Sequence, residues 1–139
     1  MSAPTFEHHF RVALHDTDAA GVLFFAHLFR HAHDAYEAWM TQLGFPLDAM
    51  LRAGDLRLPL VHAEADYRRP LHHGAAVSVQ ITPAAVGAGS FTLHYRFRTG
   101  DGNLAATART VHAAIDADGR RSLPAQLRQA LENYPLNNG

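Results

Sequence analysis

The chain of 139 residues contains no cysteine, which excludes disulfide bonds, cysteine-bound zinc and a thiol nucleophile. It has no apolar run of the ~18 residues that a membrane-spanning helix needs, and its first residues lack the apolar core of a signal peptide. Its net charge is −1, so it also lacks the basic excess of a nucleic-acid-binding protein. These absences predict a cytoplasmic protein that binds neither nucleic acid nor membrane.

The remaining composition is that of an ordinary folded domain. Hydrophobic residues make up 47% of the chain and charged residues 18%, which argues against disorder. The length predicts one domain, spanning residues 1–139, with enough residues for a sizeable core.

Period-two alternation of apolar side chains predicts strands at residues 5–14, 56–67, 76–82, 90–98 and 104–115. In the first of these strands, Phe6, Phe10, Val12 and Leu14 share one parity, which predicts that they face the core. Pro59 has no N–H to donate and therefore indicates a strand start or a sheet edge.

A long helix is predicted after the first strand. Apolar residues from Phe25 to Leu43 recur at steps of three and four, and Gly44 and Pro46 end the pattern after ~19 residues, or ~28 Å. Shorter helices are predicted at residues 46–54 and 124–131.

The order of these elements is one strand, the long helix and then four strands in meander spacing. It indicates an α+β fold in which one antiparallel sheet of about five strands wraps around one long central helix. Because that helix covers only one face of the sheet, the other face is either wet or buried in a partner. We therefore expect a homo-oligomer.

Two carboxylates, Asp16 and Asp18, precede Gly21 and the start of the long helix. Amides at a helix N-terminus point outward unpaired and carry partial positive charge, so those of residues 24–26 are suited to hold a developing oxyanion. A nearby carboxylate can attack a carbonyl carbon or deprotonate water, and the residues alone leave both routes open.

The stretch Asp16–Phe25, which reads DTDAAGVLFF, resembles the acid motif of the hotdog-fold 4-hydroxybenzoyl-CoA thioesterase-like family. In that motif an acid, any residue, the catalytic acid and two further residues precede a glycine and an aromatic-rich helix start. The resemblance covers roughly residues 5–131. The stretches Ala35–Trp39 and Leu58–Ala63 are most similar to 1,4-dihydroxy-2-naphthoyl-CoA thioesterases.

This resemblance implies that Asp18 is the catalytic carboxylate and that the backbone N–H of Phe25 polarises the thioester carbonyl. It also implies homodimers that pair their sheets edge to edge, with or without further pairing into homotetramers, and sites built between subunits. Some relatives bind CoA phosphates through basic residues in the turn before the fourth strand. Here that turn, residues 86–89, carries no charge.

Gly21, Phe24, His62 and Ser90 are the candidate substrate contacts, each with a structural alternative. The alternative for Gly21 is that only its backbone conformation is needed. Phe24, Phe25 and Phe29 suit the core, and only the amide of Phe25 is assigned a function. His62 is either a hydrogen-bonded core histidine or a contact to an aryl group.

Two further residues have interpretations of the same kind. Ser90 either contacts the pantetheine arm of the substrate or simply begins a strand. Asp16 is expected to brace its loop, as a turn-forming or capping residue does.

Histidine is frequent, with 11 residues, and His27, His31 and Asp34 could lie on one helix face at ligand spacing. No HExxH motif is present, because residues 27–31 read HLFRH. A solvated or partner-facing polar stripe explains these residues better, and we expect neither a metal nor a cofactor.

The predicted function is hydrolysis of an aromatic acyl-CoA to free acid and CoA. The alternatives are a thioesterase for aliphatic or polyketide groups on CoA or acyl carrier protein, and a non-catalytic acyl-binding module. A hotdog dehydratase or hydratase would require a histidine paired with an acid across the site, and no such pair is recognisable in the sequence.

Overall fold

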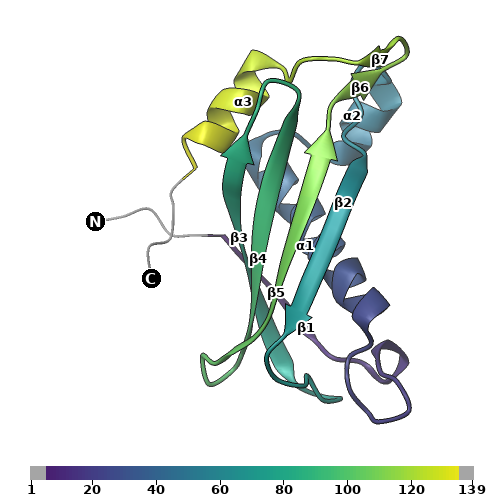
Figure 1. The fold of residues 1–139 in the computed structure, drawn as a ribbon, viewed down its shortest axis with the longest axis vertical. Helices are drawn as coiled ribbons and strands as arrows, with labels where there is room; N and C mark the ends of the chain where they lie inside the picture. Colours follow the sequence, from purple (N-terminus) through teal and green to yellow (C-terminus); the bar gives the residue numbers. More distant parts are fainter. Residues whose placement is uncertain (1–5, 135–139) are drawn as a thin grey trace.

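The computed structural model describes residues 6–134, and its main feature is a curved five-stranded antiparallel sheet with a helix along its inner face (Figure 1). The helix α1 (Phe25–Leu43) has 19 residues. The sheet contains β1 (Glu7–Arg11), β2 (Leu60–Tyr67), β3 (Ala76–Val86), β4 (Ser90–Thr99) and β5 (Leu104–Ala113). The smaller elements are η1 (Leu14–Asp16), α2 (Leu47–Ala53), β6 (Ile115–Asp116), β7 (Gly119–Arg120) and α3 (Ala125–Glu132). Of these, β6 and β7 form a separate, much smaller two-stranded sheet. This is the predicted α+β architecture.

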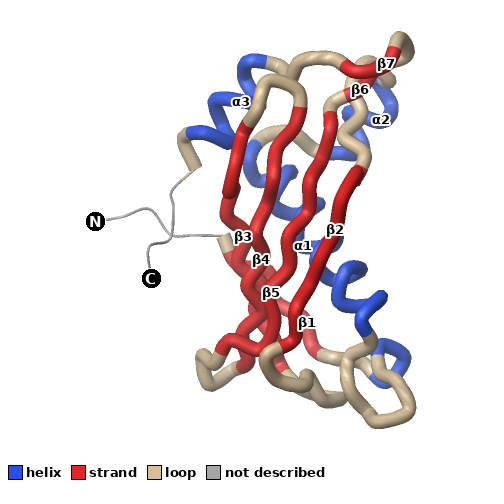
Figure 2. Tube along the Cα trace, viewed as in Figure 1, coloured by secondary structure: helices blue, strands red, loops and turns tan. Residues whose placement is uncertain are grey.

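The strands lie in the order β1-β3-β4-β5-β2, so only β3, β4 and β5 form a meander (Figure 2). The meander spacing of the last four strands does not hold for β2, which pairs with β5 at the far edge. The loop of residues 68–75 then carries the chain from this edge to β3, beside β1. As a result β2 is an open edge, and Pro59 stands directly before it, as predicted.

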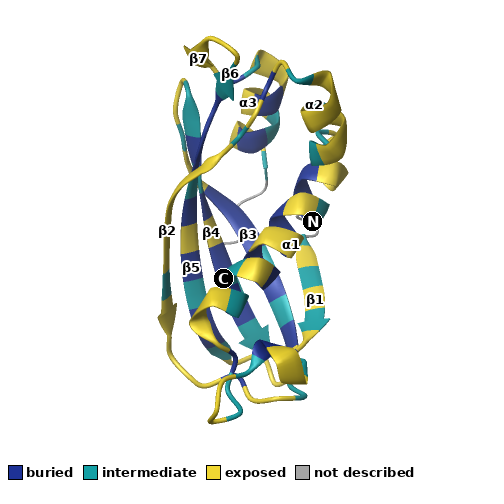
Figure 3. Cartoon of the chain, turned by 90° about the vertical axis from the view of Figure 1, so that its right-hand side faces the viewer, coloured by how far each residue is buried: buried dark blue, intermediate teal, exposed yellow. Residues whose placement is uncertain are grey.

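The core lies between α1 and the inner face of the sheet (Figure 3). The helical spacing of apolar residues places Leu28, Trp39 and Met40 fully inside. The strands contribute alternate residues, which are Val77, Val79, Ile81, Phe91, Leu93, Tyr95 and Phe97. Gly44 ends α1 with a φ of 95°, in the left-handed region, and its N–H bonds to the carbonyls of Met40 and Thr41.

The outer face of the sheet is polar. On β4 the residues that point away from α1 are Thr92, His94, Arg96 and Arg98. On the neighbouring strands, Arg109 lies 3.3 Å from the carboxylate of Glu64. The outer face was expected to be either solvent-exposed or buried in a partner. Its polar side chains agree with exposure to solvent. Between residues 6 and 134 no helix has both the length and the apolar character to cross a bilayer.

The first strand is shorter than predicted. It ends at Arg11, and Thr5 lies outside the described residues. Leu14, which was expected to face the core, begins the 3-10 turn η1 and is 73% exposed. The alternation fails there because side chains repeat their direction every three residues in a 3-10 turn, and every two residues in a strand.

Candidate active site

The loop between β1 and α1 is closed by its own backbone. The amide of Asp18 bonds to the carbonyl of Val22 at 2.9 Å, and the amide of Gly21 bonds to the carbonyl of Asp18 at 3.0 Å. Gly21 has a φ of 76°, a conformation that other residues adopt only with strain. The conformational interpretation of Gly21 therefore has direct support in the structure.

The carboxylate of Asp18 is exposed at the tip of this loop. Its Oδ1 accepts hydrogen bonds from the amides of Ala20, at 2.9 Å, and Val22, at 3.3 Å. The last residue of β2, Tyr67, donates its hydroxyl to the carbonyl of Leu23 at 2.6 Å. Burial, with a smaller contribution from the charge of Asp18, raises the pKa of Tyr67 to about 12. Asp18 therefore lies near both the start of α1 and the end of β2.

Two backbone amides at the start of α1 are available to a ligand. Within residues 6–134 the N–H groups of Phe25 and Ala26 have no acceptor, as the first turn of a helix requires. The N–H of Phe24 does have one, since it bonds to the carbonyl of Asp16 at 2.8 Å. The amides of residues 24–26 were all expected to be free, and this is wrong for Phe24, because the preceding loop folds back onto the start of the helix.

Phe24 and Phe25 do not belong to the core of the single chain. Their side chains are 49% and 48% exposed, which contradicts the prediction. Phe29, one turn further along, packs against the core as predicted. The apolar spacing of the helix continues through its first turn. In the single chain, however, the core begins only at Leu28, and the helix side chains before it stay partly or largely exposed.

Asp16 is buried and braces the loop, as expected. It is 1% exposed, and its carboxylate accepts hydrogen bonds from the amide of Ala13, from Nη2 of Arg30 and from Nε2 of His31. Burial alone would raise the pKa of Asp16, but these donors hold that pKa well below its usual range. Phe10 stacks on the ring of His31 at 3.8 Å.

The helix residues considered as metal ligands do not come together as a set. His31 is bonded to the Asp16 carboxylate, and His27 Nδ1 lies 3.4 Å from that carboxylate without a hydrogen bond to it. Asp34 instead lies 3.8 Å from Arg30. Among residues 6–134 no three histidine or acidic side chains are arranged to hold a metal ion.

His62 and Ser90 lie apart from Asp18 in the single chain. His62 is exposed on the edge strand β2, 3.2 Å from Glu64, so its interpretation as a core histidine is wrong. It precedes Tyr67 by five residues, or about 17 Å along a strand. Ser90 begins β4, at the end of the sheet opposite to the one where β2 ends and α1 begins (Figure 1).

The structure also contains an apolar hollow that the sequence did not reveal. It lies between α1, α2 and the start of β2, has a volume of about 320 Å³, and is lined mainly by Tyr36, Leu47, Leu51, Leu58, Pro59 and Ile115. His33 and Arg57 contribute its polar groups. The hydroxyl of Tyr36 is buried and has no hydrogen-bond partner within residues 6–134. Tyr36 and Leu58 both fall in stretches of family resemblance, which was the available signal.

Together these groups are suited to acyl transfer. A carbonyl oxygen held by the amides of Phe25 and Ala26 would be polarised, and the carboxylate of Asp18 is exposed in the loop that leads to them. With the sheet wrapped on α1, this site defines a hotdog protein equipped for thioester chemistry.

Comparison with known proteins agrees with that class. Residues 12–131 match the model of the thioesterase-like superfamily, and the chain belongs to this family. A 1,4-dihydroxy-2-naphthoyl-CoA hydrolase of Synechococcus elongatus is 38% identical over 110 residues, which cover 78% of this chain and 80% of the relative.

Solved structures give the same result. A 1,4-dihydroxy-2-naphthoyl-CoA thioesterase from Synechocystis superposes with a TM-score of 0.86 at 32% identity, covering 94% of this chain and 97% of that one. A gentisyl-coenzyme A thioesterase superposes with a TM-score of 0.83 at 26% identity, covering 91% and 99%.

Proposed function

We propose that this protein is an acyl-CoA thioesterase that releases a hydroxylated aromatic acid from CoA. The observation that carries the proposal is the exposed carboxylate of Asp18 in the loop that leads into α1, whose first amides, those of Phe25 and Ala26, have no acceptor among residues 6–134. The relatives named above act on 1,4-dihydroxy-2-naphthoyl-CoA and gentisyl-CoA, and both acyl groups are hydroxylated aromatic rings.

In the proposed reaction, the amides of Phe25 and Ala26 donate hydrogen bonds to the thioester carbonyl oxygen. Each such donor is worth on the order of 3 kcal/mol in the barrier. Asp18 either attacks the carbonyl carbon, forming an anhydride that water then hydrolyses, or deprotonates the attacking water. Both routes break the C–S bond and release the free acid and CoA.

A histidine–acid pair of the kind that a hotdog dehydratase needs is present, but it lies inside the protein. His31 and Asp16 are 6% and 1% exposed, and Arg30 also bonds to Asp16. A substrate would have to displace Phe10, which stacks on His31. The exposed site favours thioester hydrolysis instead.

We further propose that two chains pair through their β2 edges. All of β2 apart from Ala65 is exposed in the single chain, and an open edge is a template for another strand. Of the seven exposed large hydrophobic residues between positions 6 and 134, five lie on this strand or at the helix start, namely Phe24, Phe25, Leu60, Val61 and Tyr67. Analytical ultracentrifugation should show a dimer, and a monomer at micromolar concentration would contradict this pairing.

Such pairing would complete the site. The start of α1 lies at the Tyr67 end of β2, whereas the apolar hollow lies at the end near Leu58 and Pro59. Antiparallel pairing about the middle of β2 brings the catalytic loop of one chain against the hollow of the other. The thioester would then lie at Asp18 and the aromatic ring in the hollow, where the hydroxyl of Tyr36, which has no partner among residues 6–134, can bond to a ring hydroxyl.

The substrate class is tested by a thiol-release assay over four CoA esters: 1,4-dihydroxy-2-naphthoyl, gentisyl, benzoyl and octanoyl. We expect the two hydroxylated aromatic esters to have the highest kcat/KM, with octanoyl-CoA at least about tenfold lower, since one hydrogen bond and one ring contact separate them. Turnover confined to octanoyl-CoA would overturn the aromatic assignment. No turnover of any ester by a folded dimer would overturn the enzymatic one.

A further inference from the structure

The chain has no charge where some relatives hold the phosphates of CoA. The turn between β3 and β4, residues 87–89, consists of glycine and alanine. The sequence also contains no lysine, so its twelve arginines carry all of its permanent positive side-chain charge. Any phosphate recognition by side-chain cations must therefore use arginine.

Most of the arginines already have partners. Seven of the twelve donate to a carboxylate, an amide or a carbonyl group, and these are Arg11, Arg30, Arg52, Arg98, Arg109, Arg121 and Arg128. None of the other five side chains has a partner among residues 6–134. Among these five, Arg68 and Arg69 are the one adjacent pair, and both are exposed.

Arg68 and Arg69 begin the loop that supports the catalytic loop. In this loop, the amide of His73 bonds to the carbonyl of Gly21 at 3.0 Å, and the carbonyl of Leu71 accepts from the amide of Leu23 at 2.7 Å. A bridge between His72 and Val22 lies between these two bonds. The two loops are therefore joined along their backbones, and one of them carries Asp18.

The backbone of the arginine pair is itself fixed to the sheet. The amides of Arg68 and Arg69 both bond to the carbonyl of Ala105 on β5, at 2.8 and 3.0 Å. A fixed backbone with two unpaired guanidinium groups is suited to bind an anion, because little backbone order has to be gained on binding.

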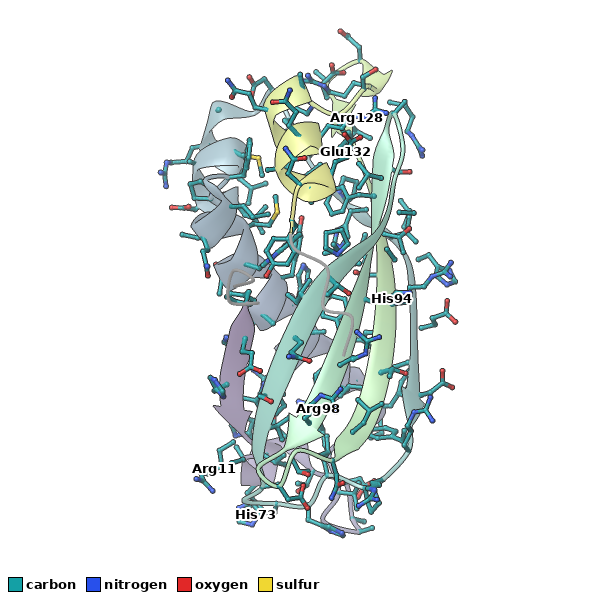
Figure 4. All side chains as sticks on the ribbon, turned by 90° about the vertical axis from the view of Figure 1, so that its left-hand side faces the viewer. Arg11, His73, His94, Arg98, Arg128 and Glu132 are labelled. Atoms are coloured by element: carbon teal, nitrogen blue, oxygen red, sulfur yellow. The ribbon has the colours of Figure 1, made fainter. Side chains whose placement is uncertain are left out.

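Further polar side chains lie at this end of the molecule. His72 and His73 are exposed in the same loop, and Figure 4 shows His73 near Arg11 at this end of the molecule. In the nearby β4–β5 turn, the carboxylate of Asp101 is already engaged by Thr99 and Asn103.

We propose that Arg68 and Arg69 bind the phosphate groups of the CoA tail while its thioester lies at Asp18. This inference rests on the proposed function and names the part of the substrate that these residues recognise. Guanidinium groups match phosphate oxygens in a bidentate fork, and the pantetheine arm joins the phosphates to the thioester. Free CoA esters are therefore the substrates, rather than esters on a carrier protein.

The test compares one aromatic acyl group on CoA and on pantetheine, which lacks the phosphates. The double variant Arg68→Gln/Arg69→Gln should raise KM for the CoA ester about tenfold and leave kcat unchanged. The same variant should hydrolyse the pantetheine ester like the wild type. Arg120→Gln, an exposed and unpaired arginine on β7, is the matched control and should change neither substrate.

Several results would overturn the proposal. These are an unchanged KM for the CoA ester, an equal loss on both esters, or a loss caused by Arg120→Gln. If the wild type hydrolyses neither ester, the proposed function fails, and calorimetric titration with CoA then decides the phosphate site independently. Weaker CoA binding by the double variant supports the site, whereas equal binding removes it.

Discussion

Two carboxylates two residues apart in one loop lie in opposite surroundings. Asp16 is buried and accepts hydrogen bonds from an arginine, a histidine and a backbone amide. Asp18 is exposed and accepts only from amides of its own loop. The first carboxylate has its bonding capacity filled by the fold, whereas the second keeps capacity for a ligand.

The two residues also act on the helix start in different ways. The carbonyl of Asp16 accepts the N–H of Phe24, and its carboxylate is bonded to Arg30 and His31 on the first two turns of α1. Asp16 thus fixes the start of α1, where the amides of Phe25 and Ala26 lie, while Asp18 contacts only its own loop. The contrast predicts that changes at the two positions should separate activity from stability.

The largest effect is expected on activity at Asp18. Replacing Asp18 with Asn should lower kcat roughly 10³-fold, because the variant can neither attack the carbonyl nor accept a proton from water. The melting temperature should stay unchanged, since the amide oxygen of Asn still accepts from Ala20 and Val22. Thiol-release kinetics and thermal denaturation measure both quantities, and wild-type turnover in this variant would contradict the assignment.

A smaller effect, this time on stability, is expected at Asp16. Asp16→Asn should lower the free energy of unfolding by about 3 kcal/mol, because it leaves Arg30 and His31 without their charged acceptor. Urea denaturation at pH 7 measures it. Asp34→Asn is the matched control, since it removes only the exposed 3.8 Å pair with Arg30 and should cost less than about 1 kcal/mol.

Acidification should remove the difference between wild type and Asp16→Asn. The native pKa of Asp16 is lowered, so its stabilising contribution is complete above the carboxyl pKa of the unfolded chain, about 4. It is lost progressively as the pH falls below that value toward the native pKa. Urea denaturation at pH 7, 5 and 3 should give equal differences at the first two values and a smaller one at pH 3. A difference that stays constant to pH 3 would exclude an ionised Asp16 as the cause.

Local patterns in the sequence predicted most of the fold. The span from Phe25 to Leu43 matches α1, and the alternation on β4 matches its burial. The position of β2 at the far edge could not be predicted, because strand pairing is non-local and leaves no mark on the pattern of one strand. The exposure of His62 follows from that edge position.

The site could be predicted less fully. A family motif, and no physical property of the sequence, separated Asp18 from Asp16. The bond from Phe24 to Asp16 joins residues of an irregular loop, and the apolar hollow is a gap between three elements, so neither has a sequence period. Such features depend on tertiary structure alone.

The smallest effect concerns a second contrast of the same kind, between the satisfied carboxylate of Asp16 and the unsatisfied hydroxyl of Tyr36. This hydroxyl is buried and has no partner in the described part of the chain, residues 6–134, and burial raises the pKa of Tyr36, so it is a neutral donor. Tyr36→Phe should not lower the melting temperature, because it removes a buried group that makes no hydrogen bond and keeps the ring stacked on His112 at 4.4 Å.

The same variant should lose selectivity. We expect its kcat/KM for 1,4-dihydroxy-2-naphthoyl-CoA to fall between about two- and tenfold, the value of one hydrogen bond, while benzoyl-CoA, which has no ring hydroxyl, is unaffected. Competition between the two esters in a thiol-release assay measures this ratio directly. An equal loss on both esters would mean that the hydroxyl serves the hollow's shape and does not recognise the substrate. A lowered melting temperature would mean that it bonds within the protein after all, and the contrast with Asp16 would then disappear.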